Sequence, residues 1–313
     1  MRDQFGRDIR YLRLSITEAC NLRCIYCTSE DKAEPGDELS APEIEAIARA
    51  AVSLGLTKIR LTGGEPLMRR DVLDICQRIR QISGLDELCM TTNGILLADF
   101  AAALHAAGID RVNVSLDTLN PARFETLTRG GDLKQVLHGI EAARRAKLQV
   151  KLNVVLMKGI NDTEIADFVA LTKDWGIQVR FIELMPIGTG ATLSPEQYLS
   201  ADAVLEACPD LIPEPSDPNS VAAVYRLPGA DVPIGLIRPM SQNFCARCNR
   251  VRVTADGKLK PCLHTAEEIP LRGLSGEALQ TALREGITGK PDKHHMDANI
   301  GSRSARGMHQ IGG

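Results

Sequence analysis

The sequence lacks the long apolar run that a membrane span needs, and it is poor in aromatic residues. Its 313 residues include one Trp, four Tyr and six Phe, although 44% are hydrophobic, which is ordinary for a soluble globular protein. No uncharged apolar segment is long enough for a transmembrane helix, and the first residues contain no apolar segment of a signal peptide. These absences predict a cytoplasmic protein that does not act on a membrane.

Neither sign of charge dominates. The chain has 37 Lys and Arg against 40 Asp and Glu, which gives a net charge of −3. Overall charge therefore provides no attraction to nucleic acid, and we expect no nucleic-acid partner. A site for an anionic ligand has to be built locally, from residues that the fold brings together.

Cysteines are numerous for a chain without a secretion signal, and they are unevenly spread. Six of the nine fall into two groups of three. In a reducing cytoplasm such groups are metal ligands rather than disulfides. The other three, Cys76, Cys89 and Cys208, stand alone, and we expect them to be small buried residues.

The first group is Cys20, Cys24 and Cys27, with the spacing Cys-x3-Cys-x2-Cys. No fourth cysteine or histidine lies nearby, since the next histidine is His105. A structural zinc site closes its coordination sphere with four protein ligands. Three thiolates in one loop instead suit a cubane iron–sulfur cluster with one iron open to a small molecule.

The second group is Cys245 and Cys248, followed by Cys262. Here His264 could complete a Cys3His zinc site, and the spacing alone supports zinc and an iron–sulfur cluster about equally. The first group favours the iron–sulfur alternative, because it already implies an oxygen-sensitive iron–sulfur enzyme.

Strand and helix patterns alternate over the first 190 residues. Strands are predicted near 10–17, 58–62, 87–92, 111–116, 150–157 and 178–185, and helices over 40–55, 71–82, 98–107, 132–146 and 163–175. Such repeats form a parallel sheet with helices outside, and six strands fall short of the eight of a closed barrel. We therefore predict an α/β fold, a partial (βα)6 TIM-type barrel that is open on one side.

The alternation ends after Met185. The later sequence predicts a linker at 186–200, a proline-rich loop at 209–219, short strands near 221–226, 232–237 and 249–254, and a helix near 265–285 before a polar tail. We predict two domains, 1–190 and 191–313, of which the second is an α+β region covering the open side of the barrel.

Cationic side chains share the polar face of several predicted strands, with apolar residues between them. The six cations are Arg13, Lys58, Arg60, Lys151, Arg250 and Arg252. In a barrel with outer helices this face looks inward, where desolvating so many like charges is costly. One such residue could be a solvated side chain near a strand end, but six together indicate a highly anionic ligand such as a triphosphate.

These motifs resemble the radical S-adenosylmethionine superfamily over residues 10–190. The second strand ends in Thr62-Gly-Gly-Glu-Pro66, which is similar to the GGEP element of that superfamily. With the second cysteine group, the cations and the terminal Gly312-Gly313, the whole chain resembles the GTP 3′,8-cyclase family of molybdenum cofactor biosynthesis. One departure is Thr28-Ser29, where that family commonly has Met-Pro.

The resemblance implies two [4Fe-4S] clusters, S-adenosylmethionine as cofactor and GTP as substrate. It assigns the first cluster to Cys20, Cys24 and Cys27 and the second to Cys245, Cys248 and Cys262. It assigns cofactor contacts to Tyr26, Gly64, Ser115 and Met185, and GTP contacts to Arg13, Arg60, Thr91, Lys151, Arg250 and Arg252. Gly312 and Gly313 would reach into the active site and aid radical formation.

The implied reaction begins when a 5′-deoxyadenosyl radical removes hydrogen from C3′ of GTP. The C3′ radical then attacks C8 of guanine and gives (8S)-3′,8-cyclo-7,8-dihydroguanosine 5′-triphosphate. The resemblance also implies a flavodoxin- or ferredoxin-type reductant, a downstream cyclic pyranopterin monophosphate synthase, and a monomer or homodimer.

Two other functions are compatible with parts of the sequence. A peptide-modifying radical enzyme would share the first cysteine group, but it would normally have more C-terminal cysteines and no use for six inward cations. A non-catalytic metal-binding module could bind RNA through a zinc-ribbon-like tail. Iron and sulfide in the purified protein would favour an enzyme, and zinc would favour the module.

Overall fold

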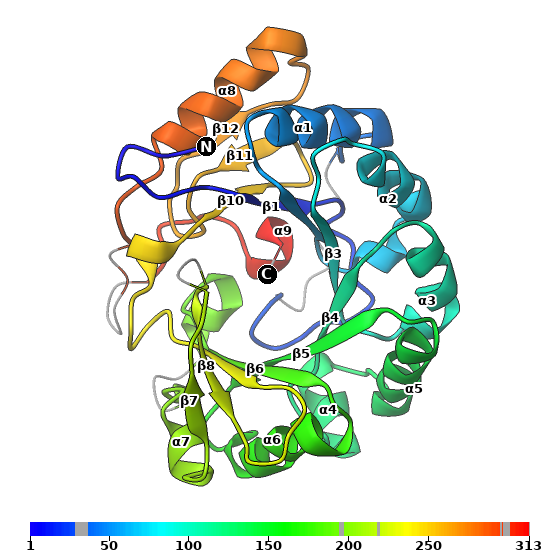
Figure 1. The fold of residues 1–313 in the computed structure, drawn as a ribbon, viewed down its shortest axis with the longest axis vertical. Helices are drawn as coiled ribbons and strands as arrows, with labels where there is room; N and C mark the ends of the chain where they lie inside the picture. The colour runs from blue at the N-terminus through cyan, green and yellow to red at the C-terminus, as the bar shows by residue number, and fades with distance from the viewer. Residues whose placement is uncertain (29–36, 194–196, 218–219, 295, 297–300, 313) are drawn as a thin grey trace.

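Parallel strands form a ring with helices on its outside (Figure 1). The structure is a computed structural model that describes residues 1–28, 37–193, 197–217, 220–294, 296 and 301–312. The six predicted strands are confirmed as β1 (Tyr11–Ser15), β2 (Lys58–Thr62), β3 (Glu87–Thr92), β4 (Arg111–Ser115), β5 (Gln149–Leu156) and β6 (Gln178–Glu183). The five predicted helices are confirmed as α1 (Ala41–Ser53), α2 (Val72–Arg80), α3 (Leu97–Ala106), α5 (Leu133–Arg145) and α6 (Ile165–Asp174).

The apolar core lies between this sheet and the outer helices. On β1 and β2, the alternate residues Leu12, Leu14, Ile59 and Leu61 are fully buried in it. Burying each such side chain contributes roughly 1.5–3 kcal/mol, which fixes the opposite, polar face of the same strands toward the inside of the ring. Because side chains alternate along each strand, the same strand supplies apolar residues to the core and polar residues to the lining of the barrel.

One helix of the barrel was not predicted. It is α4 (Pro121–Thr128), and Asn120 is its N-cap. The Asn120 side chain accepts a hydrogen bond from the backbone N–H of Arg123 at 3.0 Å. Its signals were an Asn cap followed by proline at the first helical position. Its two turns are too short to give a clear apolar period, so it was easily missed.

The C-terminal region extends both edges of the same sheet. Strand β9 (Ile234–Ile237) pairs in parallel with β6, and β10 (Arg250–Val253) pairs in parallel with β1. The strand order is β12-β11-β10-β1-β2-β3-β4-β5-β6-β9-β8-β7. The predicted partial barrel with a C-terminal region at its open side is confirmed. The domain boundary at 190 stays a prediction, because strands from both regions share one sheet.

The remaining elements are short and mostly antiparallel. They are α7 (Ala203–Ala207), β7 (Ile212–Glu214), β8 (Ala222–Arg226), β11 (Lys258–Lys260), β12 (Ile269–Pro270), α8 (Gly276–Thr288) and α9 (Met308–Ile311). Single turns of 3-10 helix occur at Pro66–Met68, Asp162–Glu164, Gly188–Thr192 and Cys245–Arg247. Within the described residues, the structure contains no helix with the length and apolar character of a membrane span.

Two C-terminal predictions were wrong in detail. The helix predicted at 265–285 starts at Gly276, because Pro270 and Gly273 interrupt the earlier residues and 269–270 instead pairs with β11. The predicted proline-rich loop contains β7, whose Pro213 is tolerated because β7 is the edge strand of the sheet.

Candidate active site

The first cysteine loop follows β1 and is held by the backbone of α4. The N–H of Arg23 donates to the carbonyl of Thr128 at 3.0 Å, and that of Ile25 donates to Leu127 at 3.0 Å. The N–H of Cys27 donates to the carbonyl of Cys24 at 2.9 Å, which closes the loop into a tight turn. The end of the helix that the sequence did not reveal therefore fixes the path of the cysteines.

The glycines after β2 let the same loop pack closely against the strand end. A Cβ on Gly63 would overlap the backbone of Thr17, and one on Gly64 would overlap the backbone of Ala19. The N–H of Gly64 donates to Thr17 at 2.9 Å, and that of Glu65 donates to Ala19 at 2.8 Å. The two glycines therefore allow the segment that leads into the cysteine loop to lie directly against the end of β2.

Glu65 connects this strand end with the next one. Its buried carboxylate accepts hydrogen bonds from Thr92 Oγ1 at 2.8 Å and from the N–H of Asn93 at 2.6 Å. Burial raises the pKa of Glu65 to about 7, although these hydrogen bonds oppose the shift. Asn93 in turn donates to Asn21 Oδ1 at 2.7 Å, so the glutamate positions the first cysteine loop through β3.

Tyr26 is tied to the end of β4. Its hydroxyl donates to Asp117 Oδ2 at 2.6 Å, and Asp117 Oδ1 accepts from the N–H of Val155 at 2.8 Å. Burial raises the pKa of Asp117 to about 6, against the effect of these two donors. Tyr26, Gly64 and Ser115 follow or end strands β1, β2 and β4, whose carboxyl ends lie at one edge of the parallel sheet.

Burial raises the pKa of all three thiols of this loop. Burial, followed by the charges of Cys20 and Asp117, raises the pKa of Cys27 to about 12. The pKa of Cys24 is raised well above its usual value, mainly by burial and then by Cys27. Three soft sulfur ligands that repel one another as anions fit a cationic iron centre, because bound iron would stabilise the thiolates.

Neither cysteine group is arranged as a compact site for one ion. In the part of the chain that the structure describes, no three His, Cys, Asp or Glu side chains are close enough to hold a single metal ion. A cubane cluster binds each thiolate at a different iron atom, so its ligands are spaced more widely than those of a single ion.

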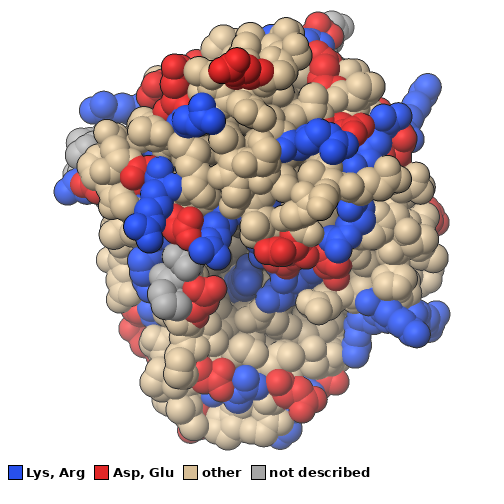
Figure 2. Space-filling view, turned by 45° about the horizontal axis from the view of Figure 1, so that its top comes forward, with Lys and Arg blue, Asp and Glu red and all other residues tan. Residues whose placement is uncertain are grey.

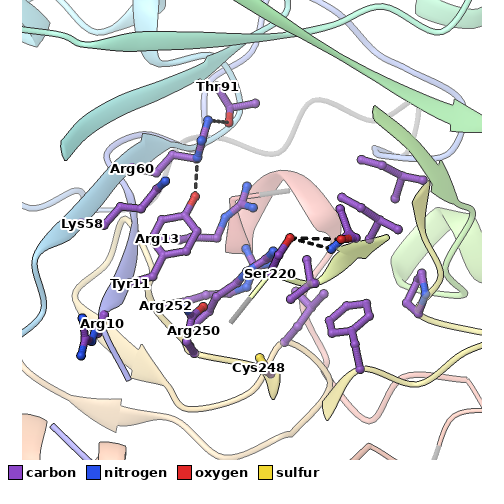
Figure 3. A pocket seen from close by; sticks show the side chains of 18 of the residues that line it. Arg10, Tyr11, Arg13, Lys58, Arg60, Thr91, Ser220, Cys248, Arg250 and Arg252 are labelled. Carbon is purple, nitrogen blue, oxygen red and sulfur yellow. Dashed lines mark hydrogen bonds between the residues drawn. The ribbon is translucent and has the colours of Figure 1, made fainter. Parts of the chain in front are cut away.

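The inside of the barrel contains a cavity of about 590 Å³. This volume lies within the range of about 300–1,000 Å³ that small-molecule sites occupy. Every side chain for which GTP contact was predicted lines it: Arg13, Arg60, Thr91, Lys151, Arg250 and Arg252. Figure 3 labels all of these except Lys151. Met185 also lines the cavity, whereas Tyr26, Gly64 and Ser115 do not.

The cavity has two further strand cations that the sequence analysis missed. Arg111 on β4 and Arg180 on β6 both line it, and Asn113 and Asn153 add neutral donors. The period-two rule that identified Arg13 also applies to these strands and could have found them. Their presence makes the cavity more cationic than the sequence analysis predicted.

Mutual repulsion and burial strain this set of cations. Burial, then Arg180 and Arg111, lowers the pKa of Lys151 to about 7. Burial, then Arg60 and Arg111, lowers the pKa of Arg180 to about 10, and burial with Arg250 does the same for Arg252. A bound polyanion would relieve this cost, so the cavity is built to bind an anion.

Two acidic groups compensate part of this charge. Glu87 pairs with Lys58 and, at 2.5 Å, with Arg111, and despite burial these partners lower its pKa to about 2. The hydroxyl of Tyr11 accepts a hydrogen bond from Arg60 (Figure 3). Burial raises the pKa of Tyr11, but Arg60, Arg13 and Arg250 outweigh it and bring the pKa to about 7. Figure 2 shows a hollow with Lys and Arg in its depth and acidic side chains around its rim.

The second cysteine group opens directly into this cavity. Cys245, Cys248 and Cys262 all line it. Burial raises the pKa of Cys248, but the cations Lys290 and Arg250 outweigh burial, so the net pKa is lowered and the thiolate is favoured. His264, which could have completed a zinc site, has a buried Nδ1 with no hydrogen-bond partner among the described residues.

The C-terminal tail also enters the barrel. Met308 lines the cavity, and Arg252 donates to the carbonyl of Ile311 at 3.1 Å and to that of Gly312. Gly312 has φ +68° and lies against Thr62 at the end of β2, where a Cβ would be 2.9 Å from the Cβ of Thr62. Gly313 lies outside the described residues.

Comparisons with known proteins agree with this geometry. Residues 14–172 match the sequence profile of the Radical SAM superfamily, and residues 177–296 match that of Molybdenum Cofactor Synthesis C. The GTP 3′,8-cyclase of Alkaliphilus metalliredigens (strain QYMF) is 47% identical over 320 residues, 100% of both chains. That of Peptoclostridium acidaminophilum is 48% identical over 319 residues, 99% of this chain and 98% of the relative.

Solved structures share the fold at low sequence identity. SuiB of Streptococcus suis, bound to S-adenosylmethionine, has a TM-score of 0.66 at 16% identity and covers 91% of this chain and 66% of its own. Native anSMEcpe with bound AdoMet has a TM-score of 0.60 at 15% identity, with 90% and 81% covered. At these identities the likeness concerns the fold alone, and it agrees with a partial barrel.

Proposed function

This chain belongs to the GTP 3′,8-cyclase family of radical S-adenosylmethionine enzymes, which act in molybdenum cofactor biosynthesis, and we propose that its central cavity binds GTP. The product is (8S)-3′,8-cyclo-7,8-dihydroguanosine 5′-triphosphate. The observation that carries the proposal is a barrel cavity lined by cations from six strands of one sheet, β10, β1, β2, β4, β5 and β6, into which the second cysteine group also opens.

The arginines of the cavity bind the triphosphate. A nucleoside triphosphate carries about four negative charges near neutral pH. Arg13, Arg250 and Arg252 lie on the adjacent strands β1 and β10, where planar guanidinium groups can each donate two hydrogen bonds to phosphate. Arg60, Thr91 and Lys151 then orient the ribose and base from β2, β3 and β5. This role is positioning, since protein side chains do no acid–base chemistry in hydrogen abstraction.

The first cysteine loop holds a [4Fe-4S] cluster, and the loops after β1, β2, β4 and β6 hold S-adenosylmethionine through Tyr26, Gly64, Ser115 and Met185. The three buried thiols fit this cluster, because bound iron would stabilise their thiolate forms. When bound, the cluster and cofactor supply the radical chemistry that removes hydrogen from C3′ and joins C3′ to C8. The barrel wall keeps the ribose beside that chemistry and excludes water.

Cys245, Cys248 and Cys262 would hold a second [4Fe-4S] cluster, which would supply a metal site for the guanine base. The three cysteines line the cavity together, which supports a cluster that faces the substrate. The tail places Gly312 beside the end of β2, and Gly312 and Gly313 would aid radical formation.

Partners and location follow from the same chemistry. A reductant of the flavodoxin or ferredoxin type supplies the electron that each turnover needs, and a cyclic pyranopterin monophosphate synthase takes up the product. All nine cysteines are free thiols, which favours a reducing cytoplasm. The protein acts as a monomer or homodimer.

Anaerobic reconstitution with iron and sulfide, followed by incubation with GTP, S-adenosylmethionine and dithionite, tests the proposal. The expected products are 5′-deoxyadenosine and the 3′,8-cyclised nucleotide. Arg13→Gln should raise the KM for GTP about tenfold, as loss of one charged hydrogen-bonding partner predicts. The matched control is Arg226→Gln, which removes an arginine that pairs with Glu214 on β7. Cofactor cleavage driven by a peptide and not by GTP would refute the proposal in favour of a peptide-modifying enzyme.

A further inference from the structure

The C-terminal tail connects the second cysteine group with the end of β2. The N–H of Arg303 donates to the carbonyl of His264 at 3.1 Å. His264 lies two residues after Cys262 in the sequence. Farther on, His309 Nδ1 lies 3.3 Å from the carbonyl oxygen of Cys27, and Ile311 is only 1% exposed. Figure 1 shows α9 inside the ring of strands. The tail therefore touches both cysteine loops on its way into the barrel.

A cluster of ion pairs lies where the tail begins to enter. Arg306 Nε lies 2.6 Å from Glu268 Oε1 and its Nη2 lies 2.9 Å from Glu268 Oε2, a two-point contact. The same Nη2 lies 2.8 Å from Asp256 Oδ2, and Nη1 lies 3.5 Å from Glu18 Oε1. The Arg306 side chain is 13% exposed. One guanidinium thus joins three segments that are far apart in the sequence.

We propose that Arg306 is a positioning residue that latches the C-terminal tail in the barrel through Glu18, Asp256 and Glu268. Glu18 belongs to the segment that leads into the first cysteine loop, and the other two residues flank β11. The latch therefore fixes the tail relative to the cysteine loop as well as to the C-terminal sheet. Its effect on turnover rests on the proposed role of the diglycine end.

Two backbone hydrogen bonds, from Ser302 to Pro186 and from Arg303 to His264, hold the start of the tail, and its other side-chain contacts are longer than those of Arg306 or are shared. Gln310 donates to Glu18 at 3.4 Å, which is a long hydrogen bond, and Arg252 is also needed for the triphosphate. Within the described residues, Arg306 makes every ion pair between the tail and the rest of the chain. A network of half-buried, two-point pairs contributes more than an isolated surface pair.

Loss of Arg306 should affect the tail and leave the sheet intact. Glu268 keeps Lys258 at 3.5 Å and Lys260 at 3.3 Å, and Asp256 keeps Lys258 at 3.3 Å. The acidic residues around β11 therefore stay compensated when Arg306 is removed. Glu18 and the tail lose a charged partner, but the sheet around β11 does not, so the latch can be tested without unfolding the barrel.

Hydrogen exchange followed by mass spectrometry on the anaerobically reconstituted enzyme measures tail docking directly. In Arg306→Gln, exchange of the tail amides over 303–312 should accelerate about ten- to a hundredfold, the cost of losing hydrogen bonds to charged groups. Arg306→Lys should give an intermediate rate, since an ammonium group cannot make the two-point contact. Arg226→Gln, which breaks a comparable pair with Glu214 on another edge of the sheet, is the matched control.

Three outcomes separate this proposal from the proposed function. Faster tail exchange in Arg306→Gln, with unchanged iron content, unchanged GTP binding and a fall in 5′-deoxyadenosine formation, supports both. Faster tail exchange with full turnover supports the latch and refutes the catalytic role of the tail. If the tail amides of Arg306→Gln exchange no faster than those of Arg226→Gln, the latch is refuted, whatever the enzymatic activity.

Discussion

GTP binding should weaken as the pH rises above neutrality, because two groups in the cavity titrate there. The pKa of Lys151 is lowered to about 7 and that of Tyr11 to about 7. A triphosphate attracts protonated Lys151 and repels the Tyr11 phenolate. Binding therefore favours the protonated form of both groups and takes up protons, so the Kd for GTP must increase with pH.

The size of the effect follows from the fraction protonated in the free protein. For a pKa of about 7, that fraction falls about twentyfold between pH 7.5 and about pH 9, provided that the bound state keeps the group protonated. Each group can thus raise the Kd by about twentyfold over this range. The γ-phosphate itself, with a pKa near 6, is already ionised there and contributes little.

Isothermal titration of GTP into the reconstituted protein without S-adenosylmethionine provides the assay. Lys151→Arg keeps a positive charge but does not titrate, so it should remove one of the two contributions to the pH dependence. Tyr11→Phe should remove the other, while the contacts of Lys58 and Arg250 with the ring face persist. Repeating the titration in buffers of different ionisation enthalpy counts the protons taken up.

A constant Kd for GTP between pH 7.5 and 9.0 would show that burial and repulsion do not lower the pKa values of these groups in the free protein. An unchanged pH dependence in both variants would assign it to groups outside the cavity. Either result would refute the argument that burial and mutual repulsion adapt the cavity to a polyanion. Circular dichroism at each pH controls for loss of folding.

Three further predictions concern the cysteine loops and the tail. Cys24→Ala should abolish 5′-deoxyadenosine formation, because a cluster with two thiolates is lost or inert; normal formation under dithionite would contradict the first cluster site. Cys248→Ala should retain cofactor cleavage without cyclising GTP, and restoration of cyclase activity by zinc alone would disprove a second iron–sulfur cluster. Gly312→Ala should displace the tail, since left-handed backbone costs a non-glycine residue about 1–2 kcal/mol and the Cβ would overlap Thr62 Oγ1. Adding Thr62→Ala, which removes a hydroxyl with no partner among the described residues, should restore part of the activity; no restoration would contradict this packing.

Local sequence features predicted the barrel and most of its lining. The cysteine spacings, the strand period of two and the helix caps each depend on residues a few positions apart. The buried Leu12 and Leu14 and the inward Arg13 follow from that period alone. The same rule could have revealed Arg111 and Arg180.

The tertiary structure decided what lies far apart in the sequence. Strands β9 and β10 join opposite edges of one sheet, although the chain between them is short, because the barrel edges offer unpaired backbone groups. The glycines after β2 pack against the cysteine loop, and the tail meets Glu18 across almost the whole chain length. Spacing and periodicity specify the polar faces of strands and the cysteine loops, but only the tertiary fold brings Arg306 to Glu18 and Gly312 to Thr62.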